Sequence, residues 1–441
     1  MTEMKDSGFA FIGQIPENWT ILRIKHAAWL KGRIGWDGLK AEEFTDKGPY
    51  LITGTDFDNG AVNWETCVHI SDERFEEDQL LHIKEGDLLI TKDGTVGKVA
   101  IVKGCPEKVS LNSGIMIIRN YTKYKYLDKY MYYTLMSNVF TDWFNYNTKP
   151  GTTILHLYQH DFDNFKFLLP PLEEQQQIVS YLDVRCSKID GAIAQRKAII
   201  EKLKDYKSAV ITKAVTKGLN PNVEMKDSGV KFIKNIPNKW NVKRLKFILS
   251  KKLRYGASES GVEYNSNLPR YIRITDIDEN GCLKNEGKLS LTEEAAKNYI
   301  LEEDCILLAR SGATVGKTFL YTMEMPRSAF AGYLIQAIPN GDEITPKFFM
   351  YYTNSNPYWM WIGYIFEQAT IMNVSAEKYQ NLYVCYPSVS EQNDIVAYLD
   401  SQCAKIDEAI EKQEQAVAKL EEYRKSIIYY AVTGKIDCRD I

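Results

Sequence analysis

Apolar residues in the stretch from Leu169 to Leu219 recur at steps of three, four or seven positions. This spacing keeps one narrow apolar stripe on one face of a long helix, as in a coiled coil. Pro170 and Pro171 end the preceding segment, and the acidic residues after them suit the positive end of a helix dipole. A helix of ~45 residues would be roughly 65 Å long. For a single copy an ordinary core helix is the alternative, but the length favours a spacer.

The chain contains this stretch twice. The second copy begins at Ser388, which forms a predicted capping box with Glu391, and it stops at Gly434. The first copy carries a net positive charge and the second a net negative charge. The two helices are therefore predicted to pair with each other as an antiparallel coiled coil. The residues predicted to form the pairing stripe are Ile178, Leu182, Ile189, Ile193, Leu203, Ile395, Leu399, Ile406, Ile410 and Leu420.

The segments before the two helices also repeat. Met4–Gly8 and Trp19 return as Met225–Gly229 and Trp240, and both tryptophans are predicted to pack in a core. Alternating residues predict strands at 52–56 and 87–91 and at 272–276 and 305–309, and helices at 127–146 and 346–361. The predicted fold class is α+β, a tandem duplication of a mixed sheet-and-helix domain followed by a long helix. The predicted boundaries are 1–170, 171–219, 220–387 and 388–437.

Composition narrows the class of protein. The net charge of −3 lacks the basic excess typical of nucleic-acid binders, although a local basic face is compatible with it. No apolar run reaches the ~18 residues of a membrane span, and the first residues lack the apolar core of a signal peptide. We expect a cytoplasmic protein that contacts no membrane. The eight cysteines include no Cys-x-x-Cys pair, so we expect them to be reduced and mostly buried, without a metal site.

Two glycine-rich turns follow the predicted strands. Ser311–Thr318 nearly spells a P-loop, but the motif lacks its first glycine, and the copy at 92–98 departs further. Two interpretations stay open: a cradle of backbone N–H groups and a lysine for a DNA phosphate, or a β-turn whose glycines satisfy φ > 0. The DNA-binding candidates in these turns are Lys92, Gly94, Thr95, Lys98, Arg310, Ser311, Gly312, Thr314 and Lys317.

A last block precedes each long helix, at 151–157 and 368–374. The two copies share a Thr-Ile pair but differ around it, as expected of one scaffold that presents different side chains. His156 and His160 would share a helix face, yet the second half has no counterpart, so a catalytic histidine is not predicted. The adenine-methyltransferase motif is also missing, and we predict a non-catalytic chain. The DNA-binding candidates outside the turns are Thr152, Thr153, His156, Arg273, Thr370 and Asn373.

These features resemble the DNA specificity subunits of type I restriction-modification systems. The resemblance rests on Lys5–Gly8 with Trp19, the Gly-Thr-Val-Gly-Lys turns, Gly151–Thr153, the Leu169–Gln175 block and their repeats. It implies two target-recognition domains that each bind half of a bipartite target in double-stranded DNA. It also implies paired helices with pseudo-two-fold symmetry that dock two adenine methyltransferase subunits, which restriction subunits join. S-adenosylmethionine, ATP and Mg²⁺ would be bound by those partners, and no cofactor or metal by this chain.

Two other classes of function remain open. One is an enzyme, either a P-loop ATPase or a self-contained methyltransferase, against which the incomplete motifs count. The other is a coiled-coil adaptor whose two domains bind proteins and make no contact with DNA. Binding of ATP or S-adenosylmethionine by the isolated chain would favour the first, and DNA binding by the methyltransferase complex would exclude the second.

Overall fold

The computed structural model describes residues 3–9, 12–33, 38–121, 126–147, 155–278, 281–312, 314–367 and 373–438. The chain forms two compact units, Met1–Arg196 with Gln415–Ile441, and Lys197–Glu414. We call them unit 1 and unit 2. Each unit contains one sheet-and-helix domain, the first part of one long helix and the last part of the other.

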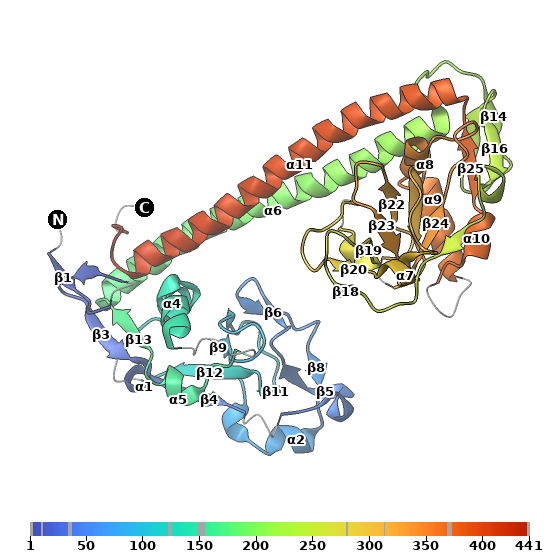
Figure 1. Cartoon of the computed structure of the whole chain (residues 1–441). Helices are drawn as coiled ribbons and strands as arrows, with labels where there is room; N and C mark the ends of the chain where they lie inside the picture. Colours follow the sequence, from blue (N-terminus) through green and yellow to red (C-terminus); the bar gives the residue numbers. More distant parts are fainter. Residues whose placement is uncertain are drawn as a thin grey trace. The chain divides into compact units, whose positions relative to one another are not determined.

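The two predicted long helices are confirmed (Figure 1). Helix α6 spans Leu172–Lys217 and helix α11 spans Val389–Val432, with 46 and 44 residues. Gly218 and Gly434 follow the helix ends with φ of +73° and +69°, the left-handed conformation in which helices commonly terminate.

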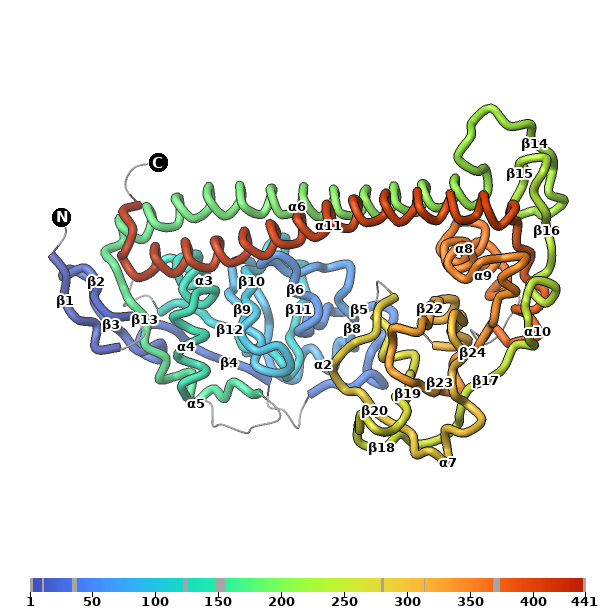
Figure 2. Tube along the Cα trace, turned by 45° about the horizontal axis from the view of Figure 1, so that its top comes forward, coloured from blue at the N-terminus to red at the C-terminus, as the bar shows by residue number. Residues whose placement is uncertain are grey.

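In unit 1 the two helices run antiparallel. Ile178 and Leu182, near the start of α6, share one apolar core with Ile427 and Ile428, near the end of α11. Further along, Arg424 Nε donates to Asp190 Oδ1 over 2.8 Å. The red and green ribbons accordingly lie side by side in both views (Figures 1 and 2).

In unit 2 the same arrangement has the roles of the helices exchanged. Ile395 and Leu399 of α11 share a core with Ile211 and Val215 of α6. Lys207 Nζ donates to Asp407 Oδ1 over 2.7 Å. Of the remaining stripe residues, Ile189 and Ile406 are buried, while those in the middle parts of the helices are half-buried, namely Ile193, Leu203, Ile410 and Leu420.

The domain of unit 1 contains many short strands and short helices. Its strands are β1 Met4–Asp6, β2 Gln14–Pro16, β3 Thr20–Arg23, β4 Ala28–Gly32, β5 Thr45–Ile52, β6 Phe57–Asp58, β7 Ala61–Val62, β8 Val68–His69, β9 Leu88–Thr91, β10 Val99–Ile101, β11 Val109–Leu111, β12 Ile115–Asn120 and β13 Lys166–Leu169. Its helices are α1 Ile24–Ala27, α2 Asp72–Glu76, α3 Asp128–Met136, α4 Asn138–Asn147 and α5 Gln159–Phe162, with 3₁₀ turns at Ala41–Glu43 and Gln79–Leu81.

The domain of unit 2 repeats this plan. Its strands are β14 Met225–Asp227, β15 Asn235–Pro237, β16 Asn241–Arg244, β17 Arg254–Tyr255, β18 Val262–Glu263, β19 Arg270–Ile272, β20 Leu289–Ser290, β21 Cys305–Ala309, β22 Thr318–Tyr321, β23 Ser328–Phe330, β24 Leu334–Ala337 and β25 Tyr383–Tyr386. Its helices are α7 Glu293–Ala296, α8 Pro346–Tyr352, α9 Asn356–Glu367 and α10 Ala376–Gln380, with 3₁₀ turns at Leu245–Phe247 and Ile274–Asp276.

Most sheets of the two domains correspond strand by strand; among the described strands, β18 adds a fourth strand to the sheet of β19 and β23, and the hairpin β6-β7 has no two-stranded counterpart in unit 2. The antiparallel sheet β10-β9-β12-β4 has its counterpart in β22-β21-β24-β17. The parallel pair β11-β5 corresponds to β23-β19, and the two-stranded β13-β3 and β1-β2 correspond to β25-β16 and β14-β15. The predicted internal repeat is therefore a repeat of topology as well as of sequence.

The sheets β10-β9-β12-β4 and β22-β21-β24-β17 are buried on both faces at their central strands. In unit 1, Leu88 and Ile90 share a core with residues of α3, α4 and the long helices, whereas Leu89 shares a core with residues of β5 and β11. Ile306 and Leu307 alternate in the same way in unit 2. This two-sided burial explains why these strands are continuous apolar runs in the sequence.

Four local predictions were wrong, two in each unit. The single helix expected over 127–146 is two helices, because the buried Ser137 hydroxyl donates to the Thr134 carbonyl and accepts from Val139 N–H. Ser355 marks the same break in unit 2. The strand expected over 52–56 ends at Ile52, because the Asp56 carboxylate accepts the Thr53 N–H over 2.7 Å and closes a turn. In unit 2 the strand β19 likewise ends at Ile272, and Ile274–Asp276 is a 3₁₀ turn.

The start of each long helix is joined to its own domain by buried polar contacts. Gln175 is buried, accepts the Leu127 N–H over 2.9 Å and donates to the Pro170 carbonyl over 2.8 Å. Gln392 accepts the Thr345 N–H over 2.8 Å. The repeated Glu-Gln motif therefore contains one buried glutamine that holds the first turn of each long helix against the domain.

The tryptophans join both long helices in each unit. Trp19 Nε1 donates to Glu174 at the start of α6 over 2.7 Å, and Trp240 Nε1 donates to Glu391 at the start of α11 over 3.1 Å. A Cβ on Gly434 would lie 3.2 Å from the Trp19 ring. The predicted capping box is only half formed: the Ser388 hydroxyl accepts the Glu391 N–H, but the Glu391 carboxylate is bound to the indole.

Candidate nucleic-acid interface

Both glycine-rich turns connect two antiparallel strands and have the same backbone hydrogen bonds. In unit 1, Thr91 N–H donates to the Lys98 carbonyl over 2.9 Å and Gly97 N–H donates to the Thr91 carbonyl over 3.0 Å. In unit 2, the Ala309 and Gly316 N–H groups make the corresponding bonds to Lys317 and Ala309. The turns are therefore copies of one hairpin connection.

The second glycine of each turn is required for packing. Gly97 has a φ of +88°, and a Cβ there would lie 2.8 Å from Cε1 of Phe140 on α4. Gly316 has a φ of +85°, and a Cβ there would lie 3.0 Å from Cζ3 of Trp359 on α9. This glycine combines a left-handed conformation with the close approach of a helix. The first glycine, Gly94 or Gly312, has no neighbour within 4 Å at its Cβ position among the described residues and is exposed.

Each turn lies against the segment that the sequence had indicated as a second candidate block. Asp93 and His156 form an antiparallel bridge, and the Leu157 N–H donates to the Lys92 carbonyl over 2.8 Å. Ser311 and Asn373 form the equivalent bridge in unit 2, where the Val374 N–H donates to the Arg310 carbonyl over 2.8 Å. The fold thus brings the two candidate blocks of each domain together.

The side chains at the two bridges differ in chemistry. The Asp93 carboxylate contacts His156 Nδ1, so this pair has one carboxylate and one imidazole. Ser311 and Asn373 are both neutral. His156 lies in this extended bridge and not on a helix with His160, which belongs to the short helix α5, so the predicted shared helix face was wrong. Thr152, Thr153 and Thr370 lie outside the described residues.

Lys92 and Arg273 are engaged inside their own domains. Lys92 is buried and its Nζ donates to the Arg33 carbonyl over 2.9 Å, while burial lowers the pKa of its ammonium. Arg273 Nη2 donates to Asp276 Oδ1 over 2.7 Å and to the Gly287 carbonyl over 2.8 Å. Both cations are therefore held by groups of their own domain and do not extend from the surface.

The other candidates lie at the surface of the turns. Lys98 and Thr95 are exposed, and Lys317, Thr314, Ser311 and Arg310 are partly exposed. The Arg310 guanidinium carbon lies 4.8 Å from the centroid of the Tyr255 ring. The sequence did not indicate Tyr255, because it lies far from Arg310 in the chain and has no aromatic counterpart in unit 1.

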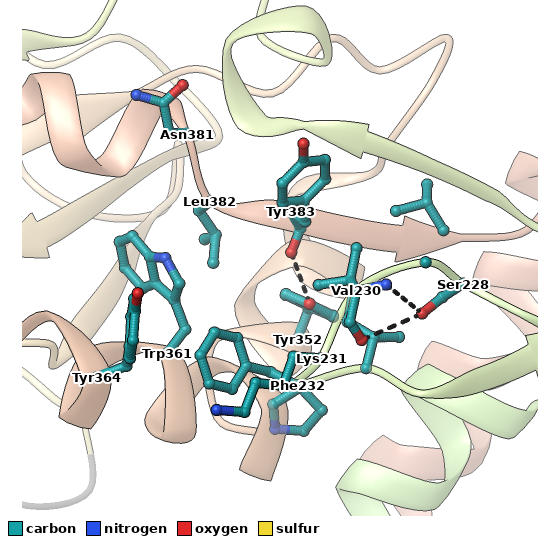
Figure 3. A pocket seen from close by; sticks show the side chains of 14 residues that line it. Ser228, Val230, Lys231, Phe232, Tyr352, Trp361, Tyr364, Asn381, Leu382 and Tyr383 are labelled. Atoms are coloured by element: carbon teal, nitrogen blue, oxygen red, sulfur yellow. Dashed lines mark hydrogen bonds between the residues drawn. The ribbon is translucent and has the colours of Figure 1, made fainter.

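Unit 2 also contains a cavity of about 430 Å³ away from the turn (Figure 3). Aromatic side chains surround it, including Phe232, Trp361, Tyr364 and Tyr383, with Lys231 and Asn381 among its lining residues. Tyr352 also lines the cavity, and its hydroxyl donates to the Tyr383 carbonyl over 2.7 Å. The residues of the Arg310–Lys317 turn are not among those that line this cavity.

Other classes of site were sought in the part of the chain that the structure describes. It contains no group of three or more His, Cys, Asp or Glu side chains arranged to hold a metal ion. Six of the eight cysteines are buried, as predicted, while Cys105 is half-buried and Cys282 exposed. Within the described residues, no helix combines the length and apolarity needed to cross a membrane.

Comparison with known proteins gives independent evidence of the family to which this chain belongs. The family described as "Type I restriction modification DNA specificity domain" matches residues 16–205 and again residues 237–420. The putative type I restriction enzyme MjaX specificity subunit of Methanocaldococcus jannaschii is 26% identical over 437 residues, 96% of this chain and 95% of the relative. The EcoBI specificity subunit of Escherichia coli is 25% identical over 364 residues, 79% of this chain and 73% of the relative.

The fold is also found among solved structures. One match is a chain from a solved structure described as "Structural basis underlying complex assembly and conformational transition of the type I R-M system". The TM-score is 0.68 and the sequence identity is 17%. The match covers 96% of this chain and 99% of the other. With two copies of the specificity domain over most of its length, the chain belongs to the family of type I restriction-modification specificity subunits.

Proposed function

We propose that this chain is the non-catalytic, sequence-specific DNA-binding subunit of a type I restriction-modification complex. Each domain binds one half of a bipartite target in double-stranded DNA, through its glycine-rich turn and the segment bridged to that turn. The paired long helices set the gap between the half-sites and dock two adenine methyltransferase subunits, which restriction subunits join. The chain itself needs no cofactor; S-adenosylmethionine, ATP and Mg²⁺ belong to the partners.

One observation carries this proposal. The two domains build the same turn and the same bridge from different side chains: Lys92 corresponds to Arg310, Asp93 to Ser311, and His156 to Asn373. A constant backbone with variable polar side chains suits two binding sites that recognise different sequences. Apart from the buried Lys92, these positions are partly exposed, where packing alone would not call for such changes.

The position of charge in the turns supports the same function. Lys98 and Lys317 lie at the end of each turn; Lys98 is exposed, as are Gly94 and Thr95, and Lys317 is partly exposed, as is Thr314. DNA binders commonly use such lysines and nearby backbone N–H groups to contact phosphates, which positions the protein without selecting a sequence. A local cationic turn can serve this purpose although the net charge of the chain is −3.

The long helices support the proposed spacing and docking role. Each one starts in a contact with one domain, through Gln175 or Gln392, and its end contributes to the core of the other unit. An α-helix rises ~1.5 Å per residue, so the number of residues in each long helix sets the distance between its two ends. Their exposed faces remain available to other subunits.

A domain exchange tests the proposal. Residues 1–170 are replaced by the first domain of a relative with a different known target, and the variant is produced with its methyltransferase subunits. Methylome sequencing should find that one half-site changes to that of the donor, while the other half-site and the gap stay the same. An exchange of residues 220–387 serves as the matched variant and should change the opposite half-site.

The outcome separates the proposal from its rivals. A complex that methylates no defined sequence, or that binds DNA without preference, contradicts a DNA-reading role and favours the adaptor. A change in both half-sites after a single exchange contradicts independent domains. Turnover of ATP, or methyl transfer, by the purified chain alone would contradict the non-catalytic assignment.

A further inference from the structure

The first residue of each glycine-rich turn is a cation in both domains, Lys92 in unit 1 and Arg310 in unit 2, but the surroundings of the two side chains differ. The strand register shows that Gly32 and Tyr255 occupy equivalent positions in the two domains. Gly32 pairs with Met116 in unit 1, and Tyr255 pairs with Ile335 in unit 2. In unit 1 the Lys92 side chain lies against Gly32, with Nζ 3.4 Å from the position that a Cβ on Gly32 would occupy. The glycine leaves room for the lysine to turn inward and bind the Arg33 carbonyl.

In unit 2 a tyrosine occupies the position of that glycine, and the cation is an arginine. The Arg310 guanidinium carbon lies 4.8 Å from the centre of the Tyr255 ring, within the range of a cation–π contact. The ring is itself fixed, since the Tyr255 hydroxyl accepts the Ala376 N–H over 2.9 Å. The aromatic ring therefore takes the space into which the cation turns in unit 1.

The guanidinium has donors left over. Nη1 is 3.5 Å from the Gly332 carbonyl, a long contact, and Nε is buried without a partner among the described residues. Nη2 makes no hydrogen bond within the described part of the chain and is not among the buried unpartnered atoms. An arginine held over an aromatic ring, with one terminal nitrogen unused by the described residues and the other in only a long contact, can donate to an external acceptor.

The backbone around Arg310 is fixed as well. Its N–H donates to the Tyr333 carbonyl over 3.0 Å, and its carbonyl accepts the Val374 N–H over 2.8 Å. Arg310 thus sits in the middle of the candidate interface, between the turn and the segment that carries Asn373. A residue held on both sides loses little further freedom when it binds.

We propose that Arg310, held on the ring of Tyr255, is the residue through which the second domain recognises a guanine in the major groove. The inference rests on the proposed function. Guanine presents two acceptors, O6 and N7, at the spacing of the two terminal guanidinium nitrogens, and this pairing is the commonest specific protein–DNA contact. Arginine binds phosphates in the same bidentate manner, so a phosphate is the competing acceptor for Arg310. Tyr255 acts as a positioning residue.

The decisive variant is Arg310→Lys, which keeps the charge and removes the planar fork. It is compared with Arg310→Ala, Tyr255→Leu and Tyr255→Phe in the complete methyltransferase complex. The matched control is Arg327→Lys, because Arg327 belongs to the same domain and its guanidinium is paired with Glu293. Binding is measured on duplexes that carry each base at every position of the second half-site, and methylome sequencing gives the preferred target.

For Arg310→Lys and Arg310→Ala we expect discrimination to fall on the order of 10- to 100-fold at one guanine of the second half-site. The first half-site should be unchanged. Tyr255→Leu should lower discrimination at the same guanine, Tyr255→Phe should largely retain it, and Arg327→Lys should have no effect on it.

Two outcomes overturn the inference and leave the proposed function intact. One is a natural target whose second half-site contains no G·C pair. The other is a uniform loss of affinity in both Arg310 variants with unchanged base preference, which would assign Arg310 to a phosphate. A wild-type complex without any sequence preference would reject the proposed function and this inference together.

Discussion

At the scale of single residues, some equivalent positions of the two domains hold the same residue for structural reasons, while others differ. Gly97 and Gly316 are retained because a side chain would meet Phe140 or Trp359 on the helix behind the turn. Lys92 and Arg310 occupy the same backbone position, yet one is turned inward and the other lies on an aromatic ring. The same turn can therefore carry different recognition chemistry, because its backbone does not depend on the variable side chains.

Lys98 and Lys317 should contact phosphates, so Lys98→Ala and Lys317→Ala should each weaken DNA binding. Removing one phosphate contact should also reduce the slope of log K against log[salt] by about 0.9. The recognised sequence should not change, because a phosphate contact carries no base information. Salt titrations of the methyltransferase complex on its own target measure both quantities.

The control variants for this prediction are Lys103→Ala and Lys297→Ala, which remove exposed lysines outside the turns. They should leave the salt slope nearly unchanged. A new methylation motif in either turn variant would show that the lysine contacts a base instead of a phosphate.

At the scale of elements, the important junction is the start of each long helix. The Glu-Gln motif has two separate tasks: the glutamate binds an indole N–H, and the buried glutamine joins the first turn to the domain. Gln392 donates to the Pro387 and Glu343 carbonyls as well, over 3.0 and 2.8 Å. These bonds fix the direction in which the helix leaves its domain.

Gln392→Leu should destabilise the chain by about 2 to 4 kcal/mol, because it removes the partner of the part-buried Thr345 N–H and of the Pro387 and Glu343 carbonyls. Equilibrium urea denaturation followed by circular dichroism measures the change. Asn393→Ala is the matched control, since Asn393 is the exposed neighbour on the same helical turn and should cost less than about 0.5 kcal/mol. Equal stability of Gln392→Leu and wild type would refute the role assigned to this glutamine.

At the scale of the whole molecule, the repeat extends to the ion pairs between the long helices. Adding 217 to the numbers of Asp190 and Lys207 gives Asp407 and Arg424, so the pair Asp190–Arg424 and the pair Lys207–Asp407 are copies of one contact. Exposed pairs of this kind contribute little stability, on the order of 0 to 1 kcal/mol. Their value is in fixing the same antiparallel register within each unit.

If the helices set the gap, lengthening both of them should change it. Four helix-forming residues are inserted between Ala198 and Ile199 of α6 and four between Gln415 and Ala416 of α11, so that the register of each unit is kept. The insertion adds about 6 Å at ~1.5 Å per residue, and DNA rises ~3.4 Å per base pair. Methylome sequencing should therefore show a gap altered by one or two base pairs with unchanged half-sites.

The control for this experiment replaces four residues at each of the same points with other helix-forming residues, without a change in length, and should preserve the gap. If the insertion altered base identity and kept the gap, the helices would not be the spacer and the proposed architecture would be wrong.

The sequence by itself determined the repeat, the two long helices and the central buried strands. The repeat is visible as matching residues, the helices as periodic apolar positions and the strands as short continuous apolar runs. It could also indicate both candidate blocks of each domain, since they differ between the halves within a repeated framework. It did not reveal the breaks at Ser137 and Ser355, where a buried hydroxyl satisfies backbone groups that a continuous helix would pair.

Only the tertiary structure decided how the candidate residues meet. Asp93 and His156, or Arg310 and Tyr255, are more than fifty residues apart, and their contact depends on the register of strands that pair across the sheet. The direction of Lys92 depends on the absence of a side chain at Gly32, on another strand. Periodicity reports whether a position is buried, but the partner of a side chain is set by which strands lie next to each other, and that is a property of the folded chain.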